Sequence, residues 1–243
     1  MTERCFLIKA PLHSGKHLPL PQPIINHLRV LRLKEGDTIF LCDGDGKKAR
    51  AQLRWIAGVP HAEIEEVIIH PPQPEVGVLI GWPKMPAAEA AARAATEVGA
   101  SWIAFFQSKR SPIQAGPSPT KIRRLERIVE DATRQSERLW LPRLLFFTDL
   151  KAAITHLGHQ HLIALDARCG EDLLPILQNI SPPLTMVIGA EGGLAPEELS
   201  VIAQKGGKVA RASLPVLRVE TAAAVFSALP RLASPRLSGI VLG

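Results

Sequence analysis

Apolar positions follow two different patterns along the chain, and the change comes near residue 72. Before that point a single helix is expected at 22–31, and short β-branched runs predict four strands, at 6–9, 37–42, 49–56 and 64–69. The run Asp43-Gly44-Asp45-Gly46 lies between two of these strands and is a hairpin signal. The N-terminal pattern therefore predicts a small β-barrel or sandwich.

The second pattern begins after the proline-rich residues 71–74, which are typical of a stiff linker. Continuous apolar runs predict strands buried on both faces, at 76–82, 102–106, 144–147, 162–165, 185–188 and 209–212. Helical patterns alternate with them, at 86–98, 119–138, 150–157, 196–203 and 220–232. This alternation predicts an α/β domain with a mostly parallel sheet covered on both faces. We therefore expect two domains, residues 1–72 and 73–243.

Residues 185–199, TMVIGAEGGLAPEEL, predict a strand, a glycine loop and a helix in immediate succession. Gly192 and Gly193 allow backbone conformations closed to other residues, and Pro196 fixes the first turn of the helix. Such a loop follows the carboxyl end of a strand, where open α/β sheets hold ligands. An ordinary tight turn between strand and helix is the alternative interpretation of this stretch alone.

Two further loops are expected at the same edge of the sheet, at 165–170 and 214–222. Together with 189–193 they could converge on one ligand. Motifs of phosphate transfer, serine hydrolysis and ordinary dinucleotide binding are absent from the sequence. The eight histidines are dispersed and lack supporting cysteines, so no metal site is expected.

Positive charge is concentrated in one region, since residues 106–145 hold nine basic and four acidic side chains in a chain of net charge +6. In the helix expected at 119–138, Arg123, Arg127, Arg134 and Arg138 share one side opposite an apolar face. A second basic segment, residues 27–37, carries Arg29, Arg32 and Lys34. Both segments could contact a polyanion such as RNA, and a solvated charged surface is the alternative for each.

Composition indicates the cellular compartment of the protein but not any reaction that it catalyses. A hydrophobic share of 46% with 21% charged residues is ordinary for a globular protein. The three cysteines are too few and too scattered for a disulfide framework, which suits a reducing compartment. The charged start MTERCFLIKA does not resemble a signal peptide, and no apolar run is long enough for a membrane helix. We expect a cytoplasmic protein that does not associate with membranes.

The sequence resembles the SPOUT methyltransferases, and in particular the RsmE-like enzymes that methylate N3 of a uridine in 16S ribosomal RNA. The matching words are IGAEGGL at 188–194, LRVETAAA at 217–224, KRS at 109–111, EDATRQSER at 130–138, and RCF with HLRVLRLKEGD near the start. The family often has proline where Ala190 stands, and glycine and a basic residue where Ser213 and Pro215 align. Neither departure affects a pocket built mainly from backbone.

This resemblance implies a PUA-like barrel that binds RNA, followed by a SPOUT-type parallel-sheet domain with a C-terminal trefoil knot. It also implies S-adenosyl-L-methionine as cofactor and a homodimer with the active site at the subunit junction. Carried over by position, the cofactor-binding residues are Leu165, Asp166, Ile188, Gly189, Glu191, Gly192, Gly193, Leu214, Leu217, Arg218 and Thr221. The expected contacts with small-subunit ribosomal RNA are Arg4, Arg29, Arg32, Lys34, Arg134 and Arg138.

Methylation of uridine N3 requires removal of a weakly acidic proton, or stabilisation of the resulting anion. We hypothesise that Arg110 or Arg218 stabilises the charge, and that Glu220 or Glu191 orients the arginine or accepts the proton. Each could instead have a structural role. The alternative functions are ribose 2′-hydroxyl methylation by the same fold and a non-catalytic RNA-binding assembly factor.

Overall fold

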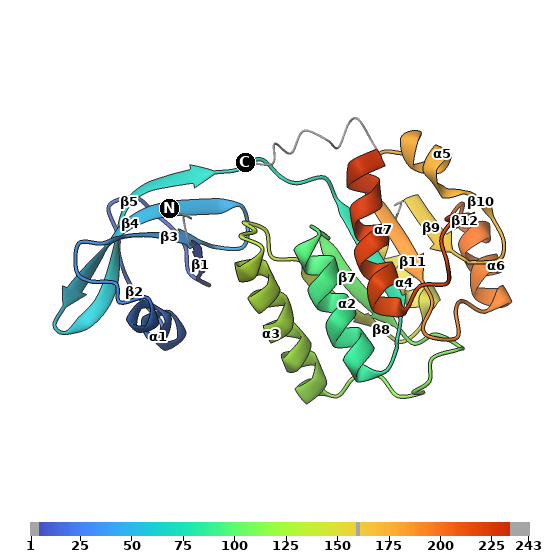
Figure 1. Ribbon diagram of the computed structural model, residues 1–243, viewed down its shortest axis with the longest axis horizontal. Helices are drawn as coiled ribbons and strands as arrows, with labels where there is room; N and C mark the ends of the chain where they lie inside the picture. The colour runs from blue at the N-terminus through green and yellow to red at the C-terminus, as the bar shows by residue number, and fades with distance from the viewer. Residues whose placement is uncertain (1–4, 159–160, 234–243) are drawn as a thin grey trace. The chain divides into compact units, whose positions relative to one another are not determined.

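A computed structural model describes residues 5–158 and 161–233 of the chain (Figure 1). The chain divides into two compact units. The first comprises the residues up to Gln73 together with Thr133–Leu141, and the second comprises the rest. The chain therefore changes units next to the proline-rich segment, and a short stretch within the second half of the sequence belongs to the first unit.

The first unit is a five-stranded sheet with the order β1-β3-β4-β5-β2 and one helix. Its elements are β1 (Cys5–Leu7), β2 (His17–Pro19), α1 (Gln22–Val30), β3 (Thr38–Cys42), β4 (Lys47–Ile56) and β5 (Val59–Ile69). The apolar side of α1 packs with the inward positions of the strands around Leu41, Leu53 and Ile64. Along β4, buried residues alternate with more exposed ones. One face of the antiparallel sheet packs on the core, and the other faces solvent.

The hairpin expected at Asp43–Gly46 is present between β3 and β4. Gly44 and Gly46 both have positive φ, at 83° and 90°. Gly46 also lies under the indole of Trp140, since a Cβ there would come within 2.1 Å of the ring. Its N–H donates to the carbonyl of Leu139, and that of Leu141 donates to the carbonyl of Gly44. This turn is the place where residues 133–141 join the first unit.

The second unit is a seven-stranded, wholly parallel sheet with the order β10-β12-β9-β11-β6-β7-β8. Its strands are β6 (Val76–Gly81), β7 (Trp102–Phe106), β8 (Arg143–Phe147), β9 (His161–Leu165), β10 (Glu171–Asp172), β11 (Leu184–Ile188) and β12 (Lys208–Arg211). Its helices are α2 (Met85–Glu97), α3 (Pro119–Gln135), α4 (Leu150–Leu157), α5 (Leu173–Gln178), α6 (Pro196–Gln204) and α7 (Val219–Ala233), except that the end of α3, from Thr133, belongs to the first unit. The α/β fold class expected from the sequence is confirmed.

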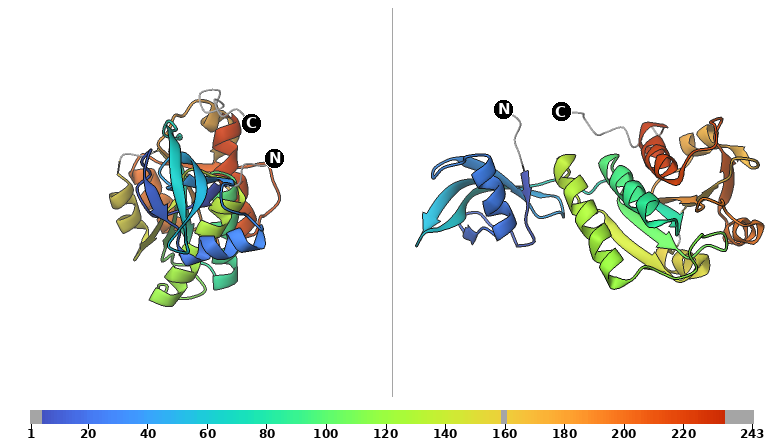
Figure 2. Two further views of the ribbon diagram at one scale, coloured as in Figure 1. Left: turned by 90° about the vertical axis from the view of Figure 1, so that its left-hand side faces the viewer. Right: turned by 60° about the horizontal axis from the view of Figure 1, so that its bottom comes forward.

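Helices cover both faces of this sheet, so its central strands are completely buried. On one face α2 and α7 lie side by side, as Figures 1 and 2 show. On the other face α4 and α6 pack with Leu79, Trp102 and Val187 in one cluster. Every residue of β6, β7 and β11 is buried, which explains the continuous apolar runs in the sequence.

Several element bounds differ from the sequence prediction. The three-residue β2 and two-residue β10 are too short to show a pattern, and α5 contains Pro175. The last strand of the first unit begins at Val59 rather than 64, because the turn at Ala57 and Gly58, both with positive φ, pairs it with β4 from its first residue. The helix expected to reach 138 ends at Gln135, and Glu137 has a φ of 53°. Among the described residues no helix has the length and apolarity needed to cross a membrane.

Candidate active site

The strand order brings three loop-bearing strand ends together in the second unit. β11 pairs with β9 on one side and with β6 on the other, and β12 pairs with β9. Since all these pairs are parallel, the loops after β9, β11 and β12 leave the sheet at the same edge. This convergence was predicted from the sequence without knowledge of the strand order.

A cavity of about 550 Å³ opens between these loops. Leu165, Asp166 and Ala167 line it from the loop after β9, and Ile188 to Glu191 with Gly193 line it from the glycine loop. The segment from Ala212 to Glu220 supplies a third side, apart from Ser213. Its size lies within the range of small-molecule sites in proteins.

Most of the cofactor-binding residues expected from the sequence lie on this cavity. The wall includes Leu165, Asp166, Ile188, Gly189, Glu191, Gly193, Leu214, Leu217 and Arg218. Of the expected catalytic residues, Glu191, Arg218 and Glu220 are part of the wall. Gly192, Thr221 and Arg110 are not among the lining residues. Arg110 nevertheless contacts the glycine loop, because its Nη1 donates to the carbonyl of Gly192 at 3.1 Å.

Close backbone packing gives the glycine loop its shape. A Cβ on Gly189 would come within 2.2 Å of the Gly193 carbonyl carbon, so only glycine fits there. Gly193 has a φ of 72°, and its N–H donates to the carbonyl of Ala190 at 2.9 Å. The loop thus folds back on itself before α6 begins.

Two glutamates attach the glycine loop and its helix to neighbouring strand ends. Glu191 Oε1 accepts a hydrogen bond of 3.0 Å from the N–H of Lys84, at the start of α2. Glu198 is only 5% exposed and accepts hydrogen bonds from Ser108 and Lys109, which follow β7. The carboxylates hold the loop from two directions.

Sequence reasoning missed the contribution of α2 and some of that of α7 to the cavity. Lys84 and Ala87 line it from the start of α2, and Ala222 and Phe226 line it from α7. Lys84 follows the strand β6, whose position beside β11 cannot be inferred from the order of elements in the sequence. The apolar helix after LRVET could have suggested Ala222, since it lies one turn beyond Arg218.

The surroundings of Cys169, in the loop after β9, do not favour its thiolate form. Local desolvation and the nearby Asp166 carboxylate raise the pKa of Cys169, which is exposed. Asp166 itself is fixed, because its Oδ1 accepts from the N–H groups of Arg168 and Cys169. Covalent catalysis by a cysteine would require the opposite shift.

The expected RNA contacts fall in the first unit. Arg29, Arg32, Lys34 and Arg134 are exposed, whereas Arg138 is only 9% exposed. Arg4 lies outside the described residues. The described residues contain no group of three or more histidine, cysteine, aspartate or glutamate side chains arranged for a metal ion.

Two family models match the chain. An RNA methyltransferase domain model matches residues 70–230, and an RNA methyltransferase PUA domain model matches residues 20–54. The first match covers more than half of the chain.

Curated relatives and solved structures agree with these matches. The chain is 30% identical to ribosomal RNA small subunit methyltransferase E of Synechocystis sp., over 81% of this chain and 66% of the relative. It is 26% identical to the Bacillus subtilis protein of that name, over 89% and 90% of the two chains. The Neisseria gonorrhoeae ribosomal RNA small subunit methyltransferase E, solved bound to S-adenosyl methionine, has a TM-score of 0.83 at 23% identity, covering 94% and 97%. The chain therefore belongs to the RNA methyltransferase family, with a PUA domain near its N-terminus and an α/β methyltransferase domain after it.

Proposed function

We propose that this protein transfers the methyl group of S-adenosyl-L-methionine to N3 of a uridine in 16S ribosomal RNA. The observation that carries the proposal is the cavity enclosed by three loops of an RNA methyltransferase domain. The names of the curated relatives support a small-subunit ribosomal RNA substrate. The solved Neisseria protein supports the cofactor.

The residues around the cavity fit S-adenosyl-L-methionine. Gly189 lets bare backbone approach a ligand closely, and the carboxylate of Asp166 lies in the wall. Apolar side chains such as Leu217 and Phe226 complete a surface suited to a flat ring. When bound, the cofactor supplies an electrophilic methyl group on a sulfonium centre.

Side chains of this protein then control the charge on the target base. Arg218 and Glu220 line the cavity, and Arg110, from the turn after β7, contacts the glycine loop beside it. We assign the two arginines to the negative charge that develops on the uracil oxygens. Glu220 is the proton acceptor, since Glu191 already accepts from the start of α2.

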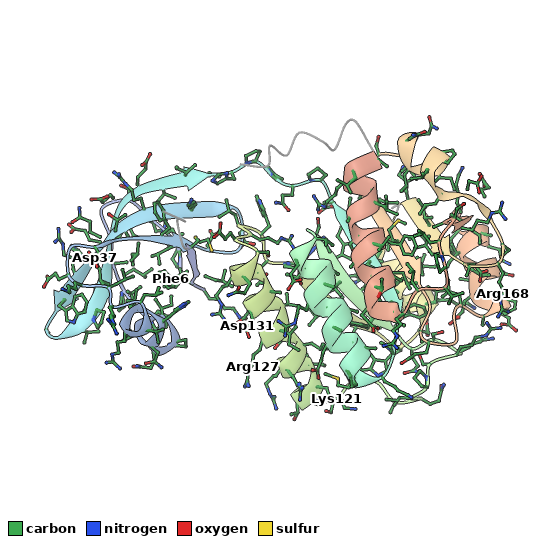
Figure 3. All side chains as sticks on the ribbon, viewed as in Figure 1. Phe6, Asp37, Lys121, Arg127, Asp131 and Arg168 are labelled. Carbon is green, nitrogen blue, oxygen red and sulfur yellow. The ribbon has the colours of Figure 1, made fainter. Side chains whose placement is uncertain are left out.

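RNA binding is assigned to the first unit and to α3. Arg29, Arg32 and Lys34 are exposed on α1 and the loop after it. On α3, Arg127 and Asp131 lie one turn apart, as Figure 3 shows, so acids accompany the arginines there. Arg138 is only 9% exposed, so the proposal rests on the exposed side chains of the group. Phosphate contacts by the exposed group would orient the RNA without reading its sequence.

We further propose a cytoplasmic homodimer. The exposed side of α7 is apolar, with half-buried Ala224, Val225, Ala228 and Leu229 and with Leu232 at 78% exposure. These positions share one side of the helix at 100° per residue, which is unusual for a surface in contact with water only. The three cysteines are free, as in a reducing compartment.

Primer extension on 16S ribosomal RNA from cells lacking the protein tests the proposed activity. A methyl group on uridine N3 blocks base pairing and stops the polymerase, so one stop should disappear in the deletion strain. Mass spectrometry of nucleosides should show loss of a methylated base. Loss of a methylated ribose instead would support 2′-hydroxyl methylation, and no affinity for S-adenosyl-L-methionine in calorimetry would leave an RNA-binding assembly factor.

A further inference from the structure

Glu198 combines deep burial with three hydrogen bonds to groups from two different strand ends. It is the third residue of α6 and is only 5% exposed. Its Oε2 accepts from the N–H of Ala195 at 2.7 Å and from Oγ of Ser108 at 3.1 Å. Its Oε1 accepts from the N–H of Lys109 at 3.0 Å. Only the bond to Ala195 is needed to cap the helix.

The two other bonds hold the turn after β7, which carries Arg110. Ser108 Oγ, while donating to Glu198, accepts from the N–H of Arg110 at 3.3 Å. The N–H of Ser108 donates to Oγ of Ser111 at 3.1 Å and closes the turn. The backbone of residues 108–111 is therefore fixed through the carboxylate of Glu198.

The same turn lies directly against the glycine loop. A Cβ on Gly192 would meet Cβ of Arg110 at 3.0 Å and its carbonyl oxygen at 3.2 Å. The guanidinium of Arg110 donates to the carbonyl of Gly192. Small movements of residues 108–111 would thus change the position of Arg110 relative to the loop that lines the cavity.

We infer that Glu198 is a positioning residue, which holds Arg110 at the edge of the cofactor cavity through Ser108 and Lys109. This inference rests on the proposed function, because it assigns Arg110 to the charge on the target base. Glu198 does not line the cavity, and its effect on methyl transfer passes through Arg110. Positioning errors of about 1 Å can lower a rate on the order of 100-fold.

The variant Glu198→Gln tests this role with little change in shape. Whichever way the amide is turned, its NH₂ group faces at least one donor, either Lys109 N–H or the pair Ala195 N–H and Ser108 Oγ. Glu197→Gln is the matched control. Glu197 is the preceding residue, also in the first turn of α6, but its side chain is 65% exposed and lies 3.9 Å from Lys109 Nζ.

We expect Glu198→Gln to lower kcat on the order of 100-fold, with the calorimetric affinity for S-adenosyl-L-methionine little changed. Glu197→Gln should retain kcat. In a double-mutant cycle, Glu198→Gln should have little further effect once Arg110 is alanine, because both variants remove the same interaction. Hydrogen exchange should also accelerate at the amides of 109 and 110 in Glu198→Gln alone.

Three outcomes would overturn the inference alone and leave the proposed function in place. Additive losses in the cycle would mean that Glu198 acts independently of Arg110. A fall in melting temperature with unchanged kcat and unchanged exchange would make Glu198 a helix cap only. A normal kcat for Arg110→Ala would show that Arg110 does not contribute to the reaction, so Glu198 could not act through it. The proposed methylation would still stand. Absence of methylation by the unaltered protein would instead refute the proposed function and this inference with it.

Discussion

At the scale of single residues, Gly189 limits the shape of the cavity that we propose binds the cofactor. This residue follows the buried strand β11, and the loop returns to within van der Waals contact of its Cα. A methyl group there would lie 2.2 Å from the Gly193 carbonyl carbon and 2.5 Å from the Leu194 nitrogen. Both are backbone atoms, so the loop itself would have to open.

Gly189→Ala is therefore expected to weaken cofactor binding. Forcing an extra methyl group into a packed site costs about 1–3 kcal/mol. If this strain destabilises the loop conformation that binds the cofactor, the affinity for S-adenosyl-L-methionine should fall roughly 10-fold or more, as measured by calorimetry. Gly116→Ala is the control, because nothing lies within 4 Å of a Cβ at that position. Equal affinity in the two variants would contradict the close packing described for the loop.

The glycines also show where residue types alone can mislead. Gly192 and Gly193 were both expected to supply unusual backbone conformations, and Gly193 does so with its positive φ. Gly192 is instead restricted by the neighbouring Arg110, and Gly189 by its own loop. Such close approaches depend on tertiary packing, so the sequence could indicate that the loop matters but not which glycine has which role.

At the scale of elements, helix α7 lines the cavity with its first turns and contacts the residues before β6 with its last turn. Its first turns line the cavity through Val219, Ala222 and Phe226. Near its other end Arg231 is partly buried, and its Nη2 donates to the carbonyls of Pro74 and Gly99. Burial lowers the pKa of Arg231 below its ordinary value. The arginine thus fixes α7 to the start of β6 and the end of α2.

Arg231→Met should destabilise the second unit without changing the cavity. The substitution keeps apolar bulk but leaves carbonyl oxygens without a charged donor, which costs about 1.5–3 kcal/mol for a hydrogen bond of this type. Urea unfolding should report this loss, and the affinity for S-adenosyl-L-methionine at low urea should be retained. Arg93→Met, at an exposed position of α2, should leave the midpoint unchanged. An unchanged midpoint for Arg231→Met would show that these bonds contribute no net stability.

Elements with long apolar runs were predictable, whereas short ones were not. The strands β6, β7 and β11 are buried on both sides, so each residue of the run is apolar or small. By contrast β10 consists of Glu171 and Asp172 and exists because it pairs with β12. The position of Lys84 on the cavity follows from the pairing of β6 with β11, a contact between residues far apart in sequence. The order of the strands in the sheet cannot be predicted from the local pattern of apolar residues.

At the scale of the whole molecule, the proposed function includes a second subunit. The apolar side of α7, defined above by Ala224, Val225, Ala228, Leu229 and Leu232, continues from the helix turns that line the cavity. A partner on that side would therefore lie next to the site. The trefoil knot and the position of the active site at a subunit junction stay predictions from the family resemblance.

Ala228→Arg combined with Leu232→Arg tests the proposed dimer. Two charges on the apolar side of α7 cannot be desolvated without partners, so a dimer that uses this side should dissociate. Light scattering should then show half the mass of the unaltered protein, and methylation should fall if the partner completes the site. Leu174→Arg is the control, since Leu174 is also apolar and 54% exposed but lies on α5. A monomeric unaltered protein that methylates its RNA would refute the homodimer, and a double variant that remains dimeric would place the interface elsewhere.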